Sequence, residues 1–168
     1  DLNDEMIEYI FQFSPLHDVG KVGVPDNIIL KNGKLTADER SVVQTHVHIG
    51  KGIIDTMVDQ FDLDGLDNVQ MLRNIVLYHH ECIDGSGYPE GLKGEEIPIE
   101  ARITSTADVF DALTSKRPYK EAWSNRKALA FMAENKGTMF DADCVDALFA
   151  SKSILKGIQE RFREDKIG

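Results

Sequence analysis

The chain has 168 residues, a length typical of one domain. Hydrophobic residues make up 42% and charged residues 29%, a mixture that indicates a folded globular protein and excludes intrinsic disorder. Lysine and arginine total 19 against 29 aspartate and glutamate, and the resulting charge of −10 argues against binding to polymeric nucleic acid. A small anionic substrate stays compatible with this charge if metal ions or a local cationic cluster reverse the field at one site.

The cysteines, the apolar runs and the first residues indicate the compartment of the protein, its relation to membranes and its relation to a longer chain. Cys82 and Cys144 lie in separate segments without a CxxC pair, so we expect two inert thiols in a reducing compartment, the cytoplasm. The apolar runs are far shorter than the ~20 residues that span a bilayer, and we expect no membrane contact from this segment. Residues 1–5 include no methionine and no signal-peptide core, which predicts that the chain continues a longer protein.

Helical periodicity dominates the sequence and predicts an all-α fold in one domain over 1–168. The first helix is expected over 2–16, with Asn3 or Asp4 as its N-cap, followed by a loop over 22–34 that contains glycine and proline.

A capping box starts the second long helical pattern. Thr36 and Glu39 form the box, and apolar residues follow at helical spacing as far as Met57. A third helix is expected over 67–81, and the glycine-rich stretch 83–97 is expected to be irregular. The remaining expected helices cover the ranges 99–113, 124–136 and 141–163.

The histidines are unevenly distributed, and they are His17, His46, His48, His79 and His80. Taken singly, His46 on an apolar helix face is more often a core residue than a ligand. His48 lies off that face, so we expect it in solvent.

Taken together, the histidines form a pattern with two aspartates. Asp18 directly follows His17, and Asp108 lies in a helix of small residues; we expect each polar group on its own helix. Buried polar groups are costly without partners, and a shared metal site would partner all of them. Imidazole and carboxylate together favour iron, manganese, zinc or nickel over calcium or magnesium. Two such metals sharing a carboxylate form a general device for cleaving phosphodiesters.

Short motifs follow one another in a specific order along nearly the whole chain. In chain order they are HDVGKVGVPD from His17, KLT from Lys34, THVHIG from Thr45, YHHE from Tyr78, DGSGYP from Asp84, GLKGEEIP from Gly91, ADVFDALT from Ala107 and RPYK from Arg117. With this set the chain resembles the HD-GYP domains, a branch of the HD phosphohydrolase superfamily.

The resemblance implies an HD-domain helical bundle with a metal centre between the helices. It also implies hydrolysis of cyclic di-GMP to linear pGpG, and on to GMP, with two or three divalent metals, most often iron or manganese, with nickel or zinc as alternatives. By position in the motifs, the metal ligands are His17, Asp18, His46, His79, His80 and Asp108.

Catalytic and substrate-binding roles follow from the same resemblance. Asp18 matches the bridging carboxylate, and Lys21 matches the lysine that faces the scissile phosphate. The residues that match substrate contacts are Lys21, Tyr88, Arg117 and Lys120. These side chains suit phosphate, because arginine forks onto phosphate oxygens and lysine supplies a point charge.

Alternatives remain open from the sequence. A related ring, 3',3'-cyclic GMP-AMP, is the alternative substrate nearest to cyclic di-GMP, because no residue in the sequence distinguishes the bases. A non-catalytic module would sense the dinucleotide or dock a partner, by family analogy a diguanylate cyclase (GGDEF) domain, but a pure receptor has no need of the full ligand set. A nucleotide phosphohydrolase of the wider superfamily is disfavoured by the DGSGYP and RPYK motifs.

The chain departs from the family pattern at several points. Cys82 follows the HHE motif where relatives carry Arg or Lys, while Gln44 and Val47 replace the commoner Lys and Pro. The family's upstream helix, with a glutamate and a histidine ligand, has no counterpart in the sixteen residues before His17. We therefore expect an N-terminally truncated domain, preceded in the full-length protein by a sensor or receiver domain. Alone, it should bind fewer metals and show little or no hydrolysis.

Overall fold

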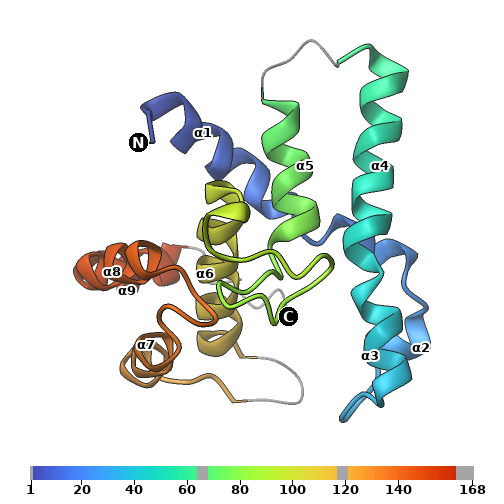
Figure 1. Ribbon diagram of the computed structural model, residues 1–168. Helices are drawn as coiled ribbons and strands as arrows, with labels where there is room; N and C mark the ends of the chain where they lie inside the picture. Colours follow the sequence, from blue (N-terminus) through green and yellow to red (C-terminus); the bar gives the residue numbers. More distant parts are fainter. Residues whose placement is uncertain (1, 64–67, 117–120, 162–168) are drawn as a thin grey trace.

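A computed structural model of the chain describes residues 2–63, 68–116 and 121–161, which form helices joined by short turns and one long loop (Figure 1). In these ranges there is no strand, only an isolated bridge between Lys136 and Phe140, so the expected all-α class is confirmed. Of the described helices, none has both the length and the apolar character that a bilayer crossing requires.

The helices are listed here in chain order, with η marking a 3-10 helix. They are α1 (Asp4–Phe13), η1 (Ser14–Leu16), η2 (Val19–Gly23), α2 (Asp26–Ile29), α3 (Ala37–Gln44), α4 (His46–Phe61), α5 (Val69–Tyr78), η3 (Gly94–Glu96), α6 (Ile99–Thr114), α7 (Asn125–Glu134), α8 (Ala142–Ala150) and α9 (Lys152–Arg161).

The first helix is shorter than the sequence predicts. Its expected cap is confirmed, because the Asn3 side chain accepts the N–H of Met6 at 2.8 Å. Pro15 follows α1 in the single turn η1, and a second turn, η2, comes directly afterwards. His17 and Asp18 consequently lie in the turn between η1 and η2. The prediction that this pair lies on a helix face is wrong.

The capping box is confirmed, but the helix that follows it is divided. Thr36 accepts the N–H of Glu39, and the Glu39 carboxylate accepts the N–H of Thr36 at 2.8 Å. α3 ends before Thr45 and α4 begins at His46. The Thr45 hydroxyl and the His46 imidazole each bond at 2.7 Å to the carbonyl three residues earlier, in competition with the helical ladder.

Local hydrogen bonds change two other predicted helix boundaries. The expected loop over 22–34 contains α2, because Pro25 fixes its own φ and its carbonyl accepts the first N–H groups of a helical turn. The expected last helix breaks at Ser151, whose hydroxyl bonds to the Ala147 carbonyl at 2.9 Å. The irregular stretch over 83–97 is confirmed apart from η3, and α5 ends at Tyr78, before the two histidines.

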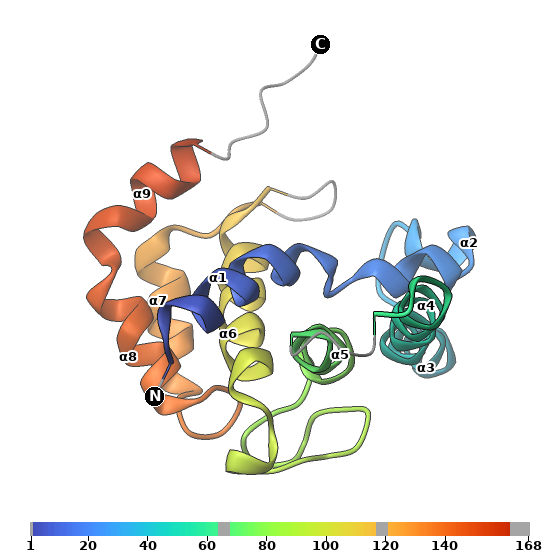
Figure 2. The same ribbon diagram turned by 90° about the horizontal axis from the view of Figure 1, so that it is seen from above.

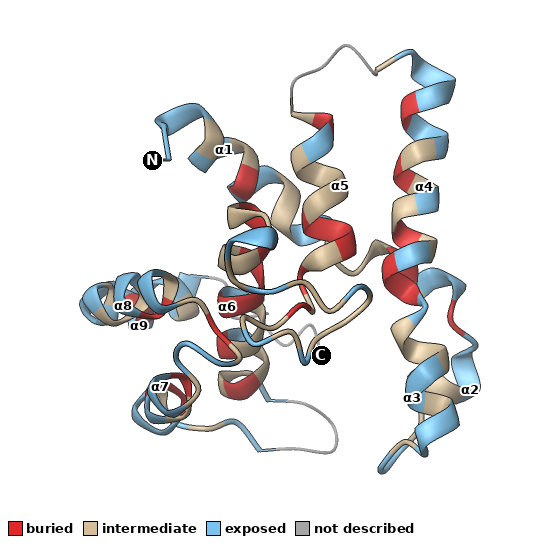
Figure 3. Ribbon diagram, in the orientation of Figure 1, coloured by how far each residue is buried: buried red, intermediate tan, exposed pale blue. Residues whose placement is uncertain are grey.

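Packing arranges the helices around a central α5. Seen from two directions, α5 lies between α6 and α4 (Figures 1 and 2). One hydrophobic cluster joins α6 to α7, α8 and α9, and a second joins α4 to α5. Buried residues also gather where the first turns of α4 meet the end of α5 (Figure 3). The candidate ligands lie at this meeting point.

η2 crosses α4 at a point where only glycine fits. A Cβ on Gly20 would overlap the carbonyl oxygen of His46 and the backbone of Gly50. This close approach brings Asp18 and Lys21, on either side of Gly20, against the beginning of α4. The crossing therefore sets the distance between the His-Asp pair and His46.

We predict that Gly20→Ala lowers the free energy of unfolding by about 3 kcal/mol, since the added methyl group overlaps backbone atoms that cannot rotate away. The matched control is Gly52→Ala in α4, where a Cβ meets nothing within 4 Å. This control should gain about 0.5–1 kcal/mol from alanine's helix propensity. Urea unfolding measures both, and equal effects of the two substitutions would contradict the packing argument.

Candidate metal centre

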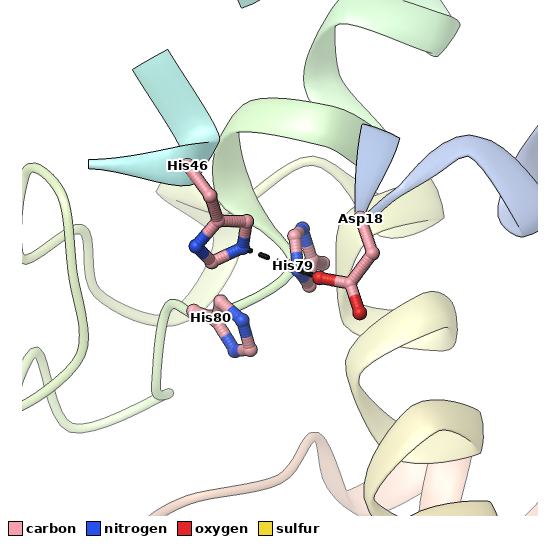
Figure 4. Close-up of side chains that lie close together, drawn as sticks. All are labelled: Asp18, His46, His79 and His80. Atoms are coloured by element: carbon pink, nitrogen blue, oxygen red, sulfur yellow. Dashed lines mark ion pairs between the residues drawn. The ribbon is translucent and has the colours of Figure 1, made fainter. Parts of the chain in front are cut away.

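Four side chains from three separate parts of the chain converge where α4 and α5 meet (Figure 4). One ligand atom from each of Asp18, His46, His79 and His80 lies within 4.8 Å of the others. Asp18 Oδ1 lies 3.3 Å from His46 Nε2 and 3.8 Å from His79 Nε2. Imidazole nitrogens and a carboxylate oxygen at such separations form a donor set suited to a transition metal.

Of the other two predicted ligands, His17 faces the second oxygen of Asp18, and Asp108 faces His17. His17 Nε2 is 3.3 Å from Asp18 Oδ2 and 3.5 Å from Asp108 Oδ1. Asp18 thus directs one oxygen towards His46 and His79 and the other towards His17. This arrangement is compatible with a carboxylate shared between two metal positions.

Three of the imidazoles are oriented by backbone carbonyl groups behind them. The Nδ1 atoms of His17, His46 and His79 lie 2.6, 2.7 and 3.0 Å from the carbonyl oxygens of Ser14, Val43 and Ile75. A carbonyl only accepts, so each Nδ1 carries the proton and donates it. In a neutral ring the lone pair is then on Nε2, which faces the site. Metal-binding histidines show this second contact almost always.

The atoms that face the site have no hydrogen-bond partner of their own. Within the part of the chain that the structure describes, the Nε2 atoms of His17, His46 and His79 and the Oδ1 atom of Asp18 are buried and unsatisfied. Buried polar atoms in folded proteins nearly always have a partner. A cluster of ordinary core histidines would satisfy both ring nitrogens, whereas a metal would satisfy all of these atoms at once. The residues therefore fit a metal.

The electrostatics of the cluster favour a bound cation. Burial opposes a charge on His17, but the facing Asp108 and Asp18 outweigh it and raise its pKa to about 10. Burial likewise opposes the charge of Asp18, yet contact with His17 holds the pKa of this carboxyl well below its usual range. Burial lowers the pKa of His79 to about 4 and that of His80 to about 3. A metal would take the place of the proton on His17, while the other two rings are already neutral.

Lys21 and Tyr88, predicted to contact the substrate, lie at the edge of the cluster. The Lys21 ammonium contacts Asp18 Oδ2 and is partly exposed. The Tyr88 ring stacks on His80 with centroids 4.8 Å apart and an interplanar angle of 29°. Burial and the charge of Asp18 raise the pKa of Tyr88 above its usual range, so it stays a neutral phenol.

The remaining predicted residues have different outcomes. Arg117 and Lys120 lie outside the described residues. His48 is exposed, as predicted, and lies away from the cluster. Cys82 and Cys144 are free thiols, each partly buried.

Glu81 belongs to the YHHE motif, which by itself gives this residue no role. The side chain is 3% exposed, and its carboxylate accepts the N–H groups of Glu90, Gly91 and Leu92 at 2.8, 3.1 and 3.1 Å. A signal was present: an acidic residue directly follows two candidate ligands and precedes a glycine-rich loop.

The HD domain family model matches residues 10–144. The chain belongs to the HD domain family. Its relatives include the cyclic di-GMP phosphodiesterase response regulator RpfG of Xanthomonas campestris pv. campestris, 47% identical over 96% of this chain and 41% of the relative. Another is 3'3'-cGAMP-specific phosphodiesterase 2 of Vibrio cholerae, 42% identical over 88% of this chain and 27% of the relative. The chain thus spans about two fifths or less of their length.

A solved structure shares the fold. The crystal structure of a cyclic GMP-AMP-specific phosphodiesterase of Vibrio cholerae, V-cGAP3, superposes with a TM-score of 0.66 over 98% of this chain and 42% of that chain, at 18% identity. The HD-domain helical fold implied by the motifs is therefore confirmed. The missing upstream helix and the truncated domain stay predictions.

We predict that Asp18→Ala abolishes metal binding, because this carboxylate faces the histidines of both ligand sets. After incubation with manganese and gel filtration, mass spectrometry should find no metal above a blank in this variant. His48→Ala, which removes an exposed histidine two residues from His46, should keep the metal content of the unsubstituted chain. A fully metal-loaded, folded Asp18→Ala protein would exclude the shared position of Asp18.

Proposed function

We propose that this chain is the catalytic domain of a metal-dependent phosphodiesterase that opens the ring of cyclic di-GMP to linear pGpG and continues to GMP. The observation that carries this proposal is the convergence of unsatisfied histidine Nε2 atoms and Asp18 Oδ1 beside Lys21. The names of the relatives support it, since RpfG is a cyclic di-GMP phosphodiesterase.

The proposal assigns the metal ligands predicted from the motifs. They would hold two divalent ions, iron or manganese, and they are His17, Asp18, His46, His79, His80 and Asp108. Bound divalent metals supply a nucleophilic water at neutral pH and polarise phosphoryl oxygens. Two ions are proposed because Asp18 directs its two oxygens towards different histidines.

The chain's own residues would position the substrate and stabilise charge. Lys21, beside Asp18 at the edge of the site, would neutralise charge that develops on the phosphate in the transition state. Arg117 and Lys120 would bind the phosphates in the ground state, a role that rests on the resemblance alone. Tyr88, stacked on His80, would line the side of the site where the rest of the dinucleotide lies. These cations offset the net charge of −10 locally.

A second substrate is supported by the same comparisons. Relatives named for 3'3'-cGAMP reach 42% identity, close to the 47% of RpfG, so overall similarity does not separate the two rings. Both rings carry the same 3',5'-phosphodiester, and the metal centre acts on that group rather than on a base. The chemistry proposed here is therefore common to both.

Regulation and location belong to the proposal as well. RpfG is named a response regulator, which supports a sensor or receiver domain in the full-length protein. A diguanylate cyclase (GGDEF) domain is the proposed protein partner, by family analogy. The free thiols of Cys82 and Cys144 support a cytoplasmic location.

Because the family's upstream helix is expected to be missing, we expect turnover to be slow. We therefore predict that the manganese-loaded chain converts cyclic di-GMP to pGpG in a single-turnover experiment, with the chain in excess over substrate. Chromatography of the products measures the conversion, and chelation of the metal should stop it. Cyclic GMP-AMP tested in parallel decides the base preference. Hydrolysis of neither ring, with metal bound, would reject the proposed activity of this chain.

We predict that Lys21→Ala retains its metal and loses turnover by about 10²-fold or more, the effect of removing a single electrostatic donor from a transition state. Lys34→Ala, which lies outside the cluster, serves as the control and should keep the turnover of the unsubstituted chain. An unchanged kcat in Lys21→Ala would assign Lys21 to structural pairing with Asp18 alone.

A further inference from the structure

The loop over 82–97 folds back on the residue that precedes it, Glu81. The loop extends from the end of α5 through η3 to the start of α6 (Figure 1). Its residues form few regular hydrogen bonds, so its shape depends on contacts with the residues next to it. The Glu81 carboxylate supplies the most concentrated of these contacts.

Glu81 is a buried carboxylate whose oxygens accept hydrogen bonds from backbone N–H groups. Oε1 accepts the N–H groups of Glu90 and Gly91 at 2.8 and 3.1 Å, and Oε2 accepts that of Leu92 at 3.1 Å. Among the described residues, no cation pairs with this 3% exposed side chain. Burial of a carboxylate is costly unless its oxygens are bonded, and successive N–H groups form a concave anion site. The three hydrogen bonds to the Glu81 carboxylate therefore stabilise the conformation of the loop.

The same loop touches the backbone of the metal-site residues at a second point. A Cβ on Gly87 would overlap the backbone of His80 and Glu81. The next residue, Tyr88, donates its N–H to the His80 carbonyl at 3.2 Å. Tyr88 thus lies between this contact and the Glu81 clamp at residues 90–92. Both ends of the short segment that carries the Tyr88 ring are fixed to the residues that follow α5.

His80 differs from the other histidines of the centre. His17, His46 and His79 are each oriented by a backbone carbonyl, but the His80 ring makes no hydrogen bond within the described part of the chain. Aromatic contacts surround it instead, with Tyr88 stacked at 4.8 Å and His79 at 4.0 Å between centroids. Stacking on Tyr88 takes the orienting role that a carbonyl has for the other rings.

We propose that Glu81 is a positioning residue of the metal centre: its carboxylate clamps residues 90–92, the clamp holds Tyr88 on His80, and Tyr88 orients the His80 imidazole as a ligand. Partners that orient ligands from behind are worth about 10–100-fold in metal affinity. The effect of Glu81 on turnover rests on the proposed function. The effect of Glu81 on metal affinity does not, because metal binding is measured without substrate.

The test measures manganese affinity of the full 168-residue chain by calorimetry. Glu81→Gln places an amide NH2 against one of the loop N–H groups, so affinity should fall by about 10–100-fold. Amide exchange at residues 90–92 should accelerate at the same time. The control is Asp141→Asn, since Asp141, the partly buried N-cap of α8, is also a carboxylate that accepts two backbone N–H groups, although it pairs with Arg102 as well. The control should lose stability but keep its manganese affinity.

A double-mutant cycle with Tyr88→Ala separates positioning from general destabilisation. Tyr88→Ala should lower manganese affinity as much as Glu81→Gln does, with amides 90–92 still protected by the intact clamp. The double variant should be no weaker than either single variant, because both act through one ring. Unchanged affinity in Tyr88→Ala, or additive losses in the double variant, would overturn the proposal. The Tyr88→Ala result decides the matter even if Glu81→Gln does not fold.

If all variants bind manganese as proposed while neither cyclic dinucleotide is hydrolysed, the positioning role stands and the proposed function fails. If the unsubstituted chain hydrolyses the ring and Glu81→Gln matches it in metal affinity, kcat and KM, the positioning role fails alone.

Discussion

The Asp18 carboxylate lies between two sets of imidazoles, with Oδ1 3.3 Å from His46 and Oδ2 3.3 Å from His17. Four buried atoms at this point, Asp18 Oδ1 among them, have no hydrogen-bond partner in the described chain, and a bound cation would partner all of them at once. Two features of the fold bring these groups together. The crossing at Gly20 brings Asp18 against the start of α4, and α5 ends directly before His79, which lies beside Asp18.

Helix ends supply the orientation of the ligands. His17 caps η1, His79 caps α5, and His46 directly follows the break after α3. Each of these imidazoles bonds through Nδ1 to a carbonyl three or four residues earlier, near the end of the preceding helix. The helix breaks are therefore part of the site, because each break places a histidine where its Nδ1 reaches such a carbonyl.

The loop over 82–97 completes the centre by a different means. His80 follows His79 directly, so its ring cannot use the same carbonyl, and it is held by the stacked Tyr88. The buried Glu81 links these residues to amides further along the loop. An acidic chain thereby combines a candidate cation-binding centre with a partly exposed Lys21, an arrangement suited to an anionic ligand despite the overall charge of −10.

From the sequence alone, helical periodicity predicted the all-α class, and local signals such as the Asn3 cap and the Thr36–Glu39 box predicted helix starts, because these depend on residues a few positions apart. The ordered motifs predicted a metal centre that includes Asp18, His46, His79 and His80, and the structure brings these four side chains together. Only the tertiary structure decided that His17 and Asp18 lie in a turn, that the long helices break at Thr45 and Ser151, and that Glu81 holds the loop. In each case a side chain competes with the helical ladder or bonds to backbone groups several residues away, and packing, which the local sequence does not contain, determines which bond forms.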